Sequence, residues 1–513
     1  MELRLFVAVA ISLLILMVFQ QSYAPLPPAD ETGALIEEEA PVRRTGEGPV
    51  KEIITGDTLT IETKSILAEV NSLGGGFSRL CIIDKDGEII NLVQADSSPY
   101  PLSLQGFGNW DLSCSGETLI ATTSGEGYSL KRSFYFTDEK KLNIETLIRN
   151  EGTGEVAFDL ATGWNGGLGT SPELEKDNLR DNRPFMQLNG RMRKKLSEGS
   201  YVGEIGMAGM LNRYFTVILL QPGDFINKAD IRKASTKKSF GSASQQVFPE
   251  ISLSGEVILG PGEEKLIEQE VYAGLKEYSY LKAIDKNLTD IFAFGFFGFL
   301  SKFFLNMLIF LNLIFGNHGV AIIILTLLLQ IVMFPLNAKS FKSMNAMNAI
   351  QPKLLKLREK YESDPQRMNE EMLALYKKHN VSPLGGCLPM LLQFPIFISL
   401  LTMLRSSTEL RYSSFLWISD LARADSLFAA IPGLSSIPII GKGGPLPLLM
   451  GGAMFLQQRM MGATEGPQKT MAYMMPIIFT LMFMNFPAGL VLYWLSNSIF
   501  TFITQYSIRR KSG

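Results

Sequence analysis

The pattern of apolar and polar positions divides the chain into two halves of different character. Between residues 51 and 275, apolar and polar residues alternate with period two, as in DTLTIETKS and YSLKRSFYF, and glycine turns separate the segments. Such alternation is typical of half-buried β-strands. From residue 291 to residue 508, long uncharged runs replace the alternation. The sequence therefore predicts a multi-domain membrane protein, with an all-β domain at residues 51–275 and an α-helical membrane domain at residues 291–508.

The uncharged runs predict a helix in the membrane interface followed by five spans. Residues 291–315 are apolar but hold Lys302, Asn306 and Asn312, so this helix is expected to lie in the interface rather than to cross it. The stretch 470–508 is too long for one crossing of about 20 residues, and its NFPAG sequence predicts a turn between two spans. The predicted spans are residues 318–338, 383–404, 443–460, 470–485 and 488–508.

The first 50 residues predict an anchor and a linker. An uncharged run follows Arg4, as in either a signal peptide or an uncleaved anchor. Pro25 directly follows a small-residue site and should hinder cleavage, so residues 1–19 are expected to form a transmembrane anchor. Residues 20–50 contain several prolines and an acidic run, which predict a flexible linker.

Lysine and arginine residues gather in residues 339–382 and in the tail, residues 509–513. By the positive-inside rule, both segments face the cytoplasm. An N-terminal anchor and five further spans then place both chain ends in the cytoplasm. The β domain is expected on the other side of the inner membrane, in the periplasm.

Residues 339–382 predict a helical hairpin. Apolar residues recur at helical spacing along its first arm, Pro352 is expected to kink or restart that arm, and Asp364 followed by Pro365 predicts the start of the second. The hairpin is either a solvated helix pair that sets topology or a docking surface for anionic lipid, a ribosome or a targeting factor. The docking residues would be Lys353, Lys356, Arg358, Lys360, Arg367, Lys377 and Lys378.

Composition excludes several classes of function. The formal net charge of the 513 residues is −2, so no global basic surface indicates nucleic-acid binding. The sequence shows no Cys/His spacing typical of a metal site and no GxxxxGK[ST] phosphate loop, and residues 51–290 contain no histidine for acid–base catalysis. We therefore expect no cofactor, no metal and no enzymatic activity. Cys81 and Cys114 form either a disulfide, if this half is exported, or a free buried pair.

Four stretches resemble the YidC/Oxa/Alb family of membrane protein insertases. They are GNHGVAIIILTLLLQIVMFPL, MNAIQPKLLKLREKY, MLALYKKHNVSPLGGCLPMLLQFPIFISLLTML and FPAGLVLYWLSNSIFTFITQ, in the family's order and spacing. The large β domain resembles the Gram-negative branch. The resemblance implies a β-supersandwich and five core helices around a polar groove that opens to the cytoplasm and to lipid. It also implies that the chain inserts nascent membrane proteins and helps them fold, alone or with the Sec translocon.

The resemblance places one unusual residue in the groove. Much of the family carries an arginine in the first core span, and alignment on VMFPL puts that position at Gln330. No charged residue lies in 303–338 or 470–508, so the groove is expected to be polar but neutral. Thr326 and Gln330 share a helical stripe and are expected to line it, whereas Asn337, near the end of the span, is expected to bond between helices.

The last span carries a second polar stripe, formed by Tyr493, Asn497, Thr501 and Thr504. The resemblance adds Gln393, Tyr493 and Trp494 to the groove-lining residues. Methionines crowd the C-terminal spans, where they either accept substrate helices or fill gaps between helices. Two rival classes are a small-molecule transporter and a membrane-anchored, carbohydrate-active periplasmic protein. The first would be indicated by repeated halves and a buried charge, and the second by sugar binding to the β domain.

Overall fold

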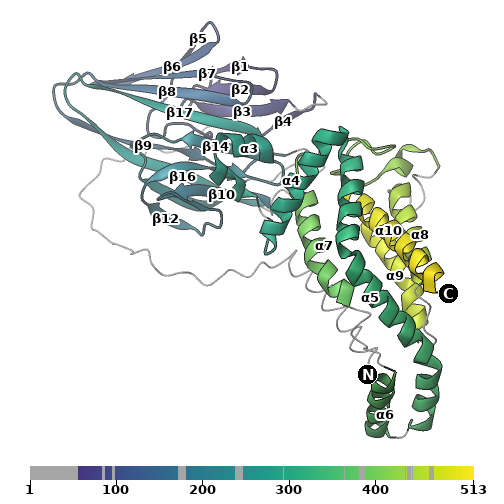
Figure 1. The fold of residues 1–513 in the computed structure, drawn as a ribbon. Helices are drawn as coiled ribbons and strands as arrows, with labels where there is room; N and C mark the ends of the chain where they lie inside the picture. Colours follow the sequence, from purple (N-terminus) through teal and green to yellow (C-terminus); the bar gives the residue numbers. More distant parts are fainter. Residues whose placement is uncertain are drawn as a thin grey trace. The chain divides into compact units, whose positions relative to one another are not determined.

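The computed structural model describes residues 56–512 except for 84–86, 95–98, 171–180, 237–245, 293, 363, 380–387, 434, 436–440, 442 and 461–466. The predicted anchor at residues 1–19 and linker at residues 20–50 lie outside the described residues. The described chain forms two compact units (Figure 1). The β unit contains the described chain from residue 56 to Gly298 together with Arg405–Tyr412, and the helical unit contains Phe299–Leu404 and Ser413 onward.

The β unit is built from three antiparallel sheets. One has the order β1 (Thr58–Glu62), β2 (Ile66–Asn71), β3 (Gly76–Ile83) and β4 (Ile89–Asn91). The nine-stranded sheet has the order β11 (Arg191–Arg193), β10 (Arg183–Leu188), β13 (Ile205–Leu211), β14 (Phe215–Gln221), β17 (Glu264–Leu275), β8 (Lys141–Asn150), β7 (Tyr128–Phe136), β6 (Thr118–Gly125) and β5 (Asp111–Ser115). The third has the order β12 (Gly199–Val202), β15 (Lys228–Thr236), β16 (Gln246–Leu259) and β9 (Val156–Trp164).

The predicted all-β character is confirmed, and its origin is visible in β8. Its sequence KLNIETLIRN alternates partly exposed and buried positions, so Ile144 and Ile148 face the core. The division of these strands among three sheets was not predicted. Alternation marks strands but does not choose their partners: β9 pairs with β16, which lies far along the chain.

A buried arginine holds the loops of the β unit together. Arg132 of β7 is fully buried, and its Nη1 donates to the carbonyl oxygens of Gly75, at 2.6 Å, and Leu102, at 3.0 Å. The guanidinium also lies 5.1 Å from the ring centre of Phe134. Burial lowers the pKa of Arg132 to about 9. Two distant loops are thereby fastened to one strand.

The two cysteines of the β unit are free. Cys81 is buried in β3, and burial raises the pKa of its thiol. Cys114 is exposed on β5, the edge strand of the nine-stranded sheet. The disulfide alternative is therefore wrong, because one thiol lies in a core and the other faces outward from a different sheet. The alternative of a free buried pair holds only for Cys81.

The helical unit contains α5 (His318–Lys360), α6 (Pro365–Lys378), α7 (Leu388–Ser406), α8 (Pro445–Met460), α9 (Pro467–Phe483) and α10 (Ala488–Ser512). Helix α4 (Gly298–Phe315) leads into it, after α3 (Tyr278–Ile284) and the short helix η2 (Lys286–Ile291) of the β unit. Among the described helices, α4 and the His318–Leu357 part of α5 are long and apolar enough to cross a membrane. The count of five spans stays a prediction.

Helix α5 joins two elements that were predicted to be separate. The predicted span 318–338 and the first arm of the hairpin form one helix of 43 residues, which runs through Pro335 and Pro352 without restarting. Asn317 caps its start by accepting from the backbone nitrogens of Gly319 and Val320. A proline removes only one hydrogen bond of the ladder, and the neighbouring turns here continue the helix.

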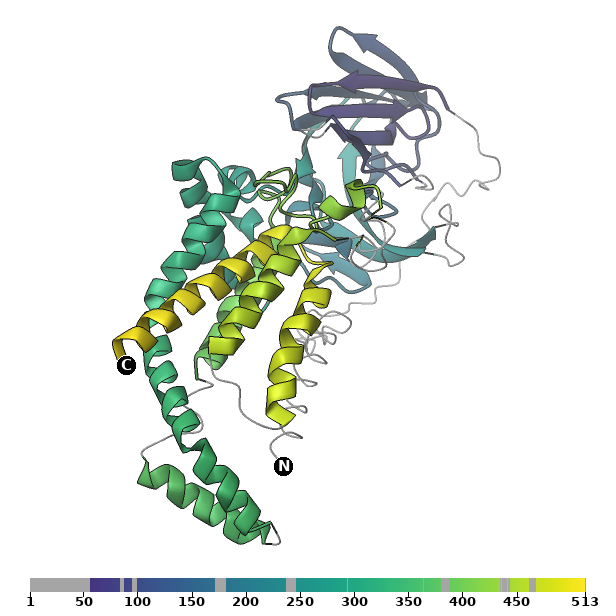
Figure 2. The ribbon, with the colours of Figure 1, turned by 90° about the vertical axis from the view of Figure 1, so that its right-hand side faces the viewer.

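Helix α5 and the helix that follows it form a hairpin, as Figure 2 shows. Helix α6 begins at Pro365, and the side chain of Asp364 accepts from the backbone nitrogen of Arg367 at 3.1 Å. Ile350 and Leu354 of α5 are buried in a small apolar core. The partners of these two residues in that core are Met347, Met372, Leu375 and Tyr376.

Helix α4 is apolar on both of its faces. Phe304, Leu305 and Leu308 are buried, and the outward side carries Phe299 and Leu313, which are 77% and 79% exposed. Exposed aromatic and aliphatic side chains of this density are suited to lipid rather than water. The placement of α4 in the membrane interface stays a prediction.

Helix packing in the rest of the unit centres on α10, which lies against α5 and α8, while α8 packs on α9. The α8–α9 contact depends on a small residue, because a Cβ added at Gly451 would collide with Oγ1 of Thr480. The next residue, Gly452, has open space around it: a Cβ there would meet nothing within 4 Å.

We predict that Gly451→Leu lowers the thermal stability of the purified protein in detergent, whereas Gly452→Leu leaves it nearly unchanged. Both substitutions improve the helix propensity of α8 equally, so only the collision distinguishes them. The expected loss for Gly451→Leu is about 1–3 kcal/mol, as for other overpacked sites. Equal melting temperatures for the two variants would refute the close packing of α8 on α9.

Candidate functional site

The polar residues expected in the groove meet where α10 packs against α5. Gln330 of α5 is half-buried, and its Nε2 donates to Oδ1 of Asn497 at 2.6 Å and to Oγ1 of Thr501 at 3.0 Å. Asn337, two turns further along α5, donates from Nδ2 to Oε1 of Gln330 at 3.3 Å. The amide of Gln330 is thus bonded through both its nitrogen and its oxygen. We call Gln330, Asn337, Asn497 and Thr501 the amide network.

Helical spacing explains why the amide network forms. Asn497 and Thr501 are four residues apart on α10, so their side chains stand one above the other on the face that meets α5. Gln330 and Asn337 are two turns apart and share a face of α5. Asn337 was expected to bond between helices; it bonds to Gln330 in its own helix, and Gln330 makes the interhelical bonds.

A second polar contact joins α7 to α10. Nε2 of Gln393 donates to Oη of Tyr493 at 2.7 Å, and Tyr493 is 2% exposed. Trp494, the next residue, lies instead in an aromatic cluster. Its ring centre is 5.0 Å from that of Phe397 on α7, and Phe479 and Phe483 of α9 lie at 5.7 and 5.4 Å. Gln393 and Tyr493 are brought together as a bonded pair, and Trp494 packs beside them.

Thr326 stands apart from these contacts. It is 1% exposed, and its Oγ1 donates to the carbonyl oxygen of Ile322 in its own helix at 2.7 Å. A hydroxyl bonded in this way is already satisfied within α5. The structure therefore brings Gln330, but not Thr326, into the amide network.

One polar residue on α10 was missed by the sequence analysis. Gln505 is 6% exposed, and its Oε1 is buried without a hydrogen-bond partner among the described residues. Gln505 continues the spacing of Asn497 and Thr501 by a further four residues. The i, i+4, i+8 repeat of polar residues at 497, 501 and 505 could have identified Gln505 from the sequence. The predicted stripe ends at Thr504 instead.

The basic residues of the hairpin stand away from its small apolar core. The described side chains among them, those of Lys353, Lys356, Lys360, Arg367, Lys377 and Lys378, are all exposed. The side chain of Arg358 lies outside the description. Nζ of Lys353 lies 3.3 Å from Nε2 of His379. Exposed cations of this kind can meet an anionic partner without losing an internal ion pair.

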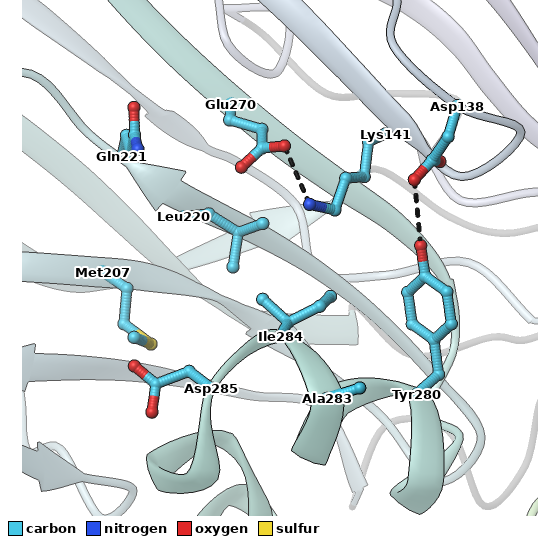
Figure 3. A pocket seen from close by; sticks show the side chains of 10 residues that line it. All are labelled: Asp138, Lys141, Met207, Leu220, Gln221, Glu270, Tyr280, Ala283, Ile284 and Asp285. Carbon is cyan, nitrogen blue, oxygen red and sulfur yellow. Dashed lines mark hydrogen bonds and ion pairs between the residues drawn. The ribbon is translucent and has the colours of Figure 1, made fainter.

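The β unit contains a cavity of about 530 Å3 beside α3 (Figure 3). Four of its ionisable groups bond in pairs: Nζ of Lys141 lies 2.9 Å from Oε1 of Glu270, and Oη of Tyr280 donates to Asp138 at 3.2 Å. Burial and the neighbouring Asp138 raise the pKa of Tyr280 to about 12. These groups therefore hold the cavity walls together rather than forming an acid–base pair. In the described parts of the chain, no group of three or more His, Cys, Asp or Glu residues is placed to hold a metal ion.

Comparison with known proteins gives the chain a family. A family model described as the 60Kd inner membrane protein matches residues 310–513, and one described as the YidC periplasmic domain matches residues 115–307. A membrane protein insertase YidC from Endomicrobium trichonymphae is 36% identical over 467 residues, which cover 89% of this chain and 85% of the relative. One from Nitratidesulfovibrio vulgaris is 32% identical over 501 residues, which cover 89% and 88% of the two chains.

A solved structure of an active YidC insertase with its first transmembrane domain resolved aligns over 99% of both chains, at 16% identity and a TM-score of 0.41. The sequence relatives are sufficient by themselves, because they exceed 30% identity over most of both chains. The resemblance inferred from the four sequence stretches is therefore confirmed. The chain belongs to the YidC family of membrane protein insertases.

Proposed function

We propose that the polar contacts of α10 with α5 and α7 form the path on which this insertase receives the hydrophilic segments of nascent membrane proteins. We further propose that this path works through hydration and exchange of hydrogen bonds rather than through a fixed positive charge. The observation that carries the proposal is the uncharged amide network around Gln330.

The energy scale supports the exchange of hydrogen bonds. The three bonds of Gln330, at about 0.6 kcal/mol each for bonds inside a membrane, cost about 2 kcal/mol to break. Placing one charged residue at the bilayer centre costs roughly 2.5–3.5 kcal/mol on insertion scales. When the bonds within the amide network break, its side chains can bond to water or to a substrate peptide instead. These new bonds can offset much of the cost of placing a charged residue in the membrane. No nucleotide hydrolysis is needed for terms of this size, because the apolar helix of the substrate then partitions into lipid.

A neutral path differs from one with an arginine in its choice of substrates. An arginine would attract acidic residues of the substrate and repel basic ones. Gln330 offers both a donor and an acceptor, so it can bond to acidic, basic or uncharged polar groups. We propose that this insertase accepts hydrophilic segments of either charge sign.

The proposed topology follows the distribution of positive charge. The cations of the hairpin and the tail face the cytoplasm, both chain ends lie there, and the β unit lies in the periplasm. The hairpin is proposed to dock a ribosome, a targeting factor or anionic lipid, and the Sec translocon is proposed as a partner. The names of the matching family models, an inner membrane protein and a periplasmic domain, support this placement.

Substitution at Gln330 tests the proposal. Insertion of a model substrate into proteoliposomes is expected to proceed with wild type and with Gln330→Arg, and to slow about tenfold with Gln330→Leu, equivalent to a loss of about 1.4 kcal/mol. The reason is that leucine can neither hold water nor bond to a polar segment. Val332→Leu, at an outward-facing position 65% exposed, is the matched control and should insert normally.

An inactive wild type that Gln330→Arg rescues would show that positive charge is essential and would refute the neutral path. Normal insertion by Gln330→Leu would show that the amide network only joins helices. Both results are readable in one assay, provided that the variants are reconstituted to equal amounts.

The bond between Gln393 and Tyr493 gives an independent prediction. A double-mutant cycle of Gln393→Leu and Tyr493→Phe, followed by reversible unfolding in detergent, should yield a coupling energy of about 0.6–1.7 kcal/mol. Gln393→Leu combined with Thr480→Val is the control, since Oγ1 of Thr480 bonds within its own helix to Pro476. A coupling energy near zero for Gln393 with Tyr493 would mean that the two helices are not joined there.

A further inference from the structure

The last two residues of α7 and the loop that follows them belong to the β unit rather than to the helical unit. The chain leaves the helical unit at Leu404, contributes Arg405–Tyr412 to the β unit, and returns at Ser413. We call Arg405–Tyr412 the strap. No sequence pattern indicates the strap, because it lies between two predicted spans. The β unit is thus built from two separate stretches of chain.

Hydrogen bonds tie the strap to the end of β17 and the start of α3. Oγ1 of Thr408 donates to the carbonyl oxygen of Lys276 at 2.9 Å, and the backbone nitrogen of Tyr278 donates to Oε1 of Glu409 at 3.0 Å. Oε2 of Glu409 accepts from Oγ of Ser407 at 2.7 Å. The strap therefore satisfies backbone groups that a helix start and a strand end would otherwise leave open.

The strap is buried as a core segment would be. Ser407 and Leu410 have no exposed surface, and Arg411 is 4% exposed. Its guanidinium carbon lies 5.0 Å from the ring centre of Tyr214 and 5.6 Å from that of Phe215. The Nε and Nη2 atoms of Arg411 have no partner among the described residues. A buried cation held by aromatic faces persists only where the surrounding packing fixes it.

The part of the β unit that contacts the strap, which we call the seat, includes Tyr214, Phe215, Lys276 and Tyr278. Lys276 is a second buried cation there. Nζ of Lys276 donates to the carbonyl oxygen of Asn212 at 2.9 Å, and the backbone nitrogen of Lys276 donates to the carbonyl oxygen of Tyr214 at 2.7 Å. At the far end of the strap, Tyr412 adopts a φ of 62°, a conformation that costs a non-glycine residue energy. Tyr412 lies where the chain leaves the β unit. Its strained conformation indicates that contacts with the seat, rather than the preferences of the local sequence, determine the course of the backbone there.

We propose that the strap is a docking device: Leu410 and Arg411 fasten the loop after α7 into the β unit, so that the β unit holds the chain at the end of α7 as well as at the start of α4. This goes beyond insertion and does not depend on the path through the amide network. Because α7 also carries Gln393, the strap residues act as positioning residues for that helix.

Cleavage of the direct connection tests the proposal on the full chain. A protease site is introduced between Gly295 and Phe296, the purified protein is cut in detergent, and the fragment from Phe296 onward is captured by a C-terminal tag. We expect the preceding fragment, which contains most of the β unit, to be captured with it. Arg411→Ala and Leu410→Asp should each weaken this retention at least about tenfold, the factor set by about one lost core interaction.

Three features keep the test decisive. The released fragment has the wild-type sequence in both variants, so a change in its retention originates in the strap residues. Arg411→Lys keeps the charge but not the planar group and should retain the fragment partially. Arg423→Ala removes a half-exposed arginine of the helical unit and should retain it fully. Loss of the fragment from the cut wild type, or its full retention by Arg411→Ala and Leu410→Asp, would overturn the proposal.

The pH dependence of retention separates docking through this seat from any other association. Burial lowers the pKa of Lys276 to about 7; Arg183 and Arg213 lower it as well, and Asp181 and Glu409 raise it. Release of the strap would rehydrate Lys276 and return its pKa toward 10.5, so the released state binds a proton that the docked state lacks. Retention through Lys276 should therefore strengthen as the pH rises above about 7.

Glu409 acts in the opposite direction and has to be removed from the comparison. Burial raises its pKa, so the docked state holds a proton more tightly there, and this contribution weakens as pH rises. The series is run in a Glu409→Gln background, which keeps the acceptor oxygen. Retention should increase from pH 7 to pH 9, and addition of Lys276→Met should abolish the increase. Two results would contradict docking at this seat. One is retention that does not change with pH in Glu409→Gln alone, and the other is retention that still increases with pH when Lys276→Met is added.

Discussion

A polar side chain inside an apolar interior is costly unless it finds a partner, because hydrocarbon and packed apolar side chains offer none. In the helical unit this constraint draws α5, α7 and α10 together. Gln330 bonds to Asn497 and Thr501, and Gln393 bonds to Tyr493. Each bond is weak in itself, and the partners are amides and hydroxyls that can exchange one hydrogen bond for another. An interior held in this way is ordered when empty and able to accept a polar peptide.

The β unit meets the same constraint with two buried arginines. Arg132 is held by the carbonyl oxygens of two loops, and Arg411 by the aromatic rings of Tyr214 and Phe215. Each stands where segments distant in sequence meet. Removing either side chain would leave its neighbours unsatisfied or unpacked, which is why a buried cation can fix a junction that a leucine would leave adjustable.

Local patterns and long-range pairing were not equally predictable. The alternation in β8, the cap at Asp364 and the polar stripe on α10 are properties of short segments, and the sequence predicted them. The pairing of β9 with β16, the path of the strap and the bond from Gln330 to Asn497 depend on residues far apart, and no local pattern specifies them. Pro352 was expected to kink or restart its helix; the helix does not restart but continues through Pro352, since tertiary context outweighs the loss of one backbone bond.

For the residues expected in the groove, the sequence predicted which side chains are polar better than it predicted which partners they bond to. Residue type and spacing correctly singled out Gln330 as a polar group in a neutral span, and the family resemblance singled out Gln393. Thr326 has the same spacing but bonds within its own helix, because a short β-hydroxyl reaches the carbonyl one turn back and a glutamine does not. Gln505 was missed because the stripe was read as ending one residue earlier.

Solvent accessibility of position 330 tests the central claim most directly. With Cys81, Cys114 and Cys387 replaced by serine, Gln330→Cys and Ile331→Cys are reacted in membranes with a water-soluble maleimide, which modifies only thiols that reach water. The account predicts reaction at position 330 and little at position 331, which is 60% exposed on the outer face of α5. An unreactive thiol at position 330, as silent as the one at 331, would show a dry and sealed contact and would contradict the account.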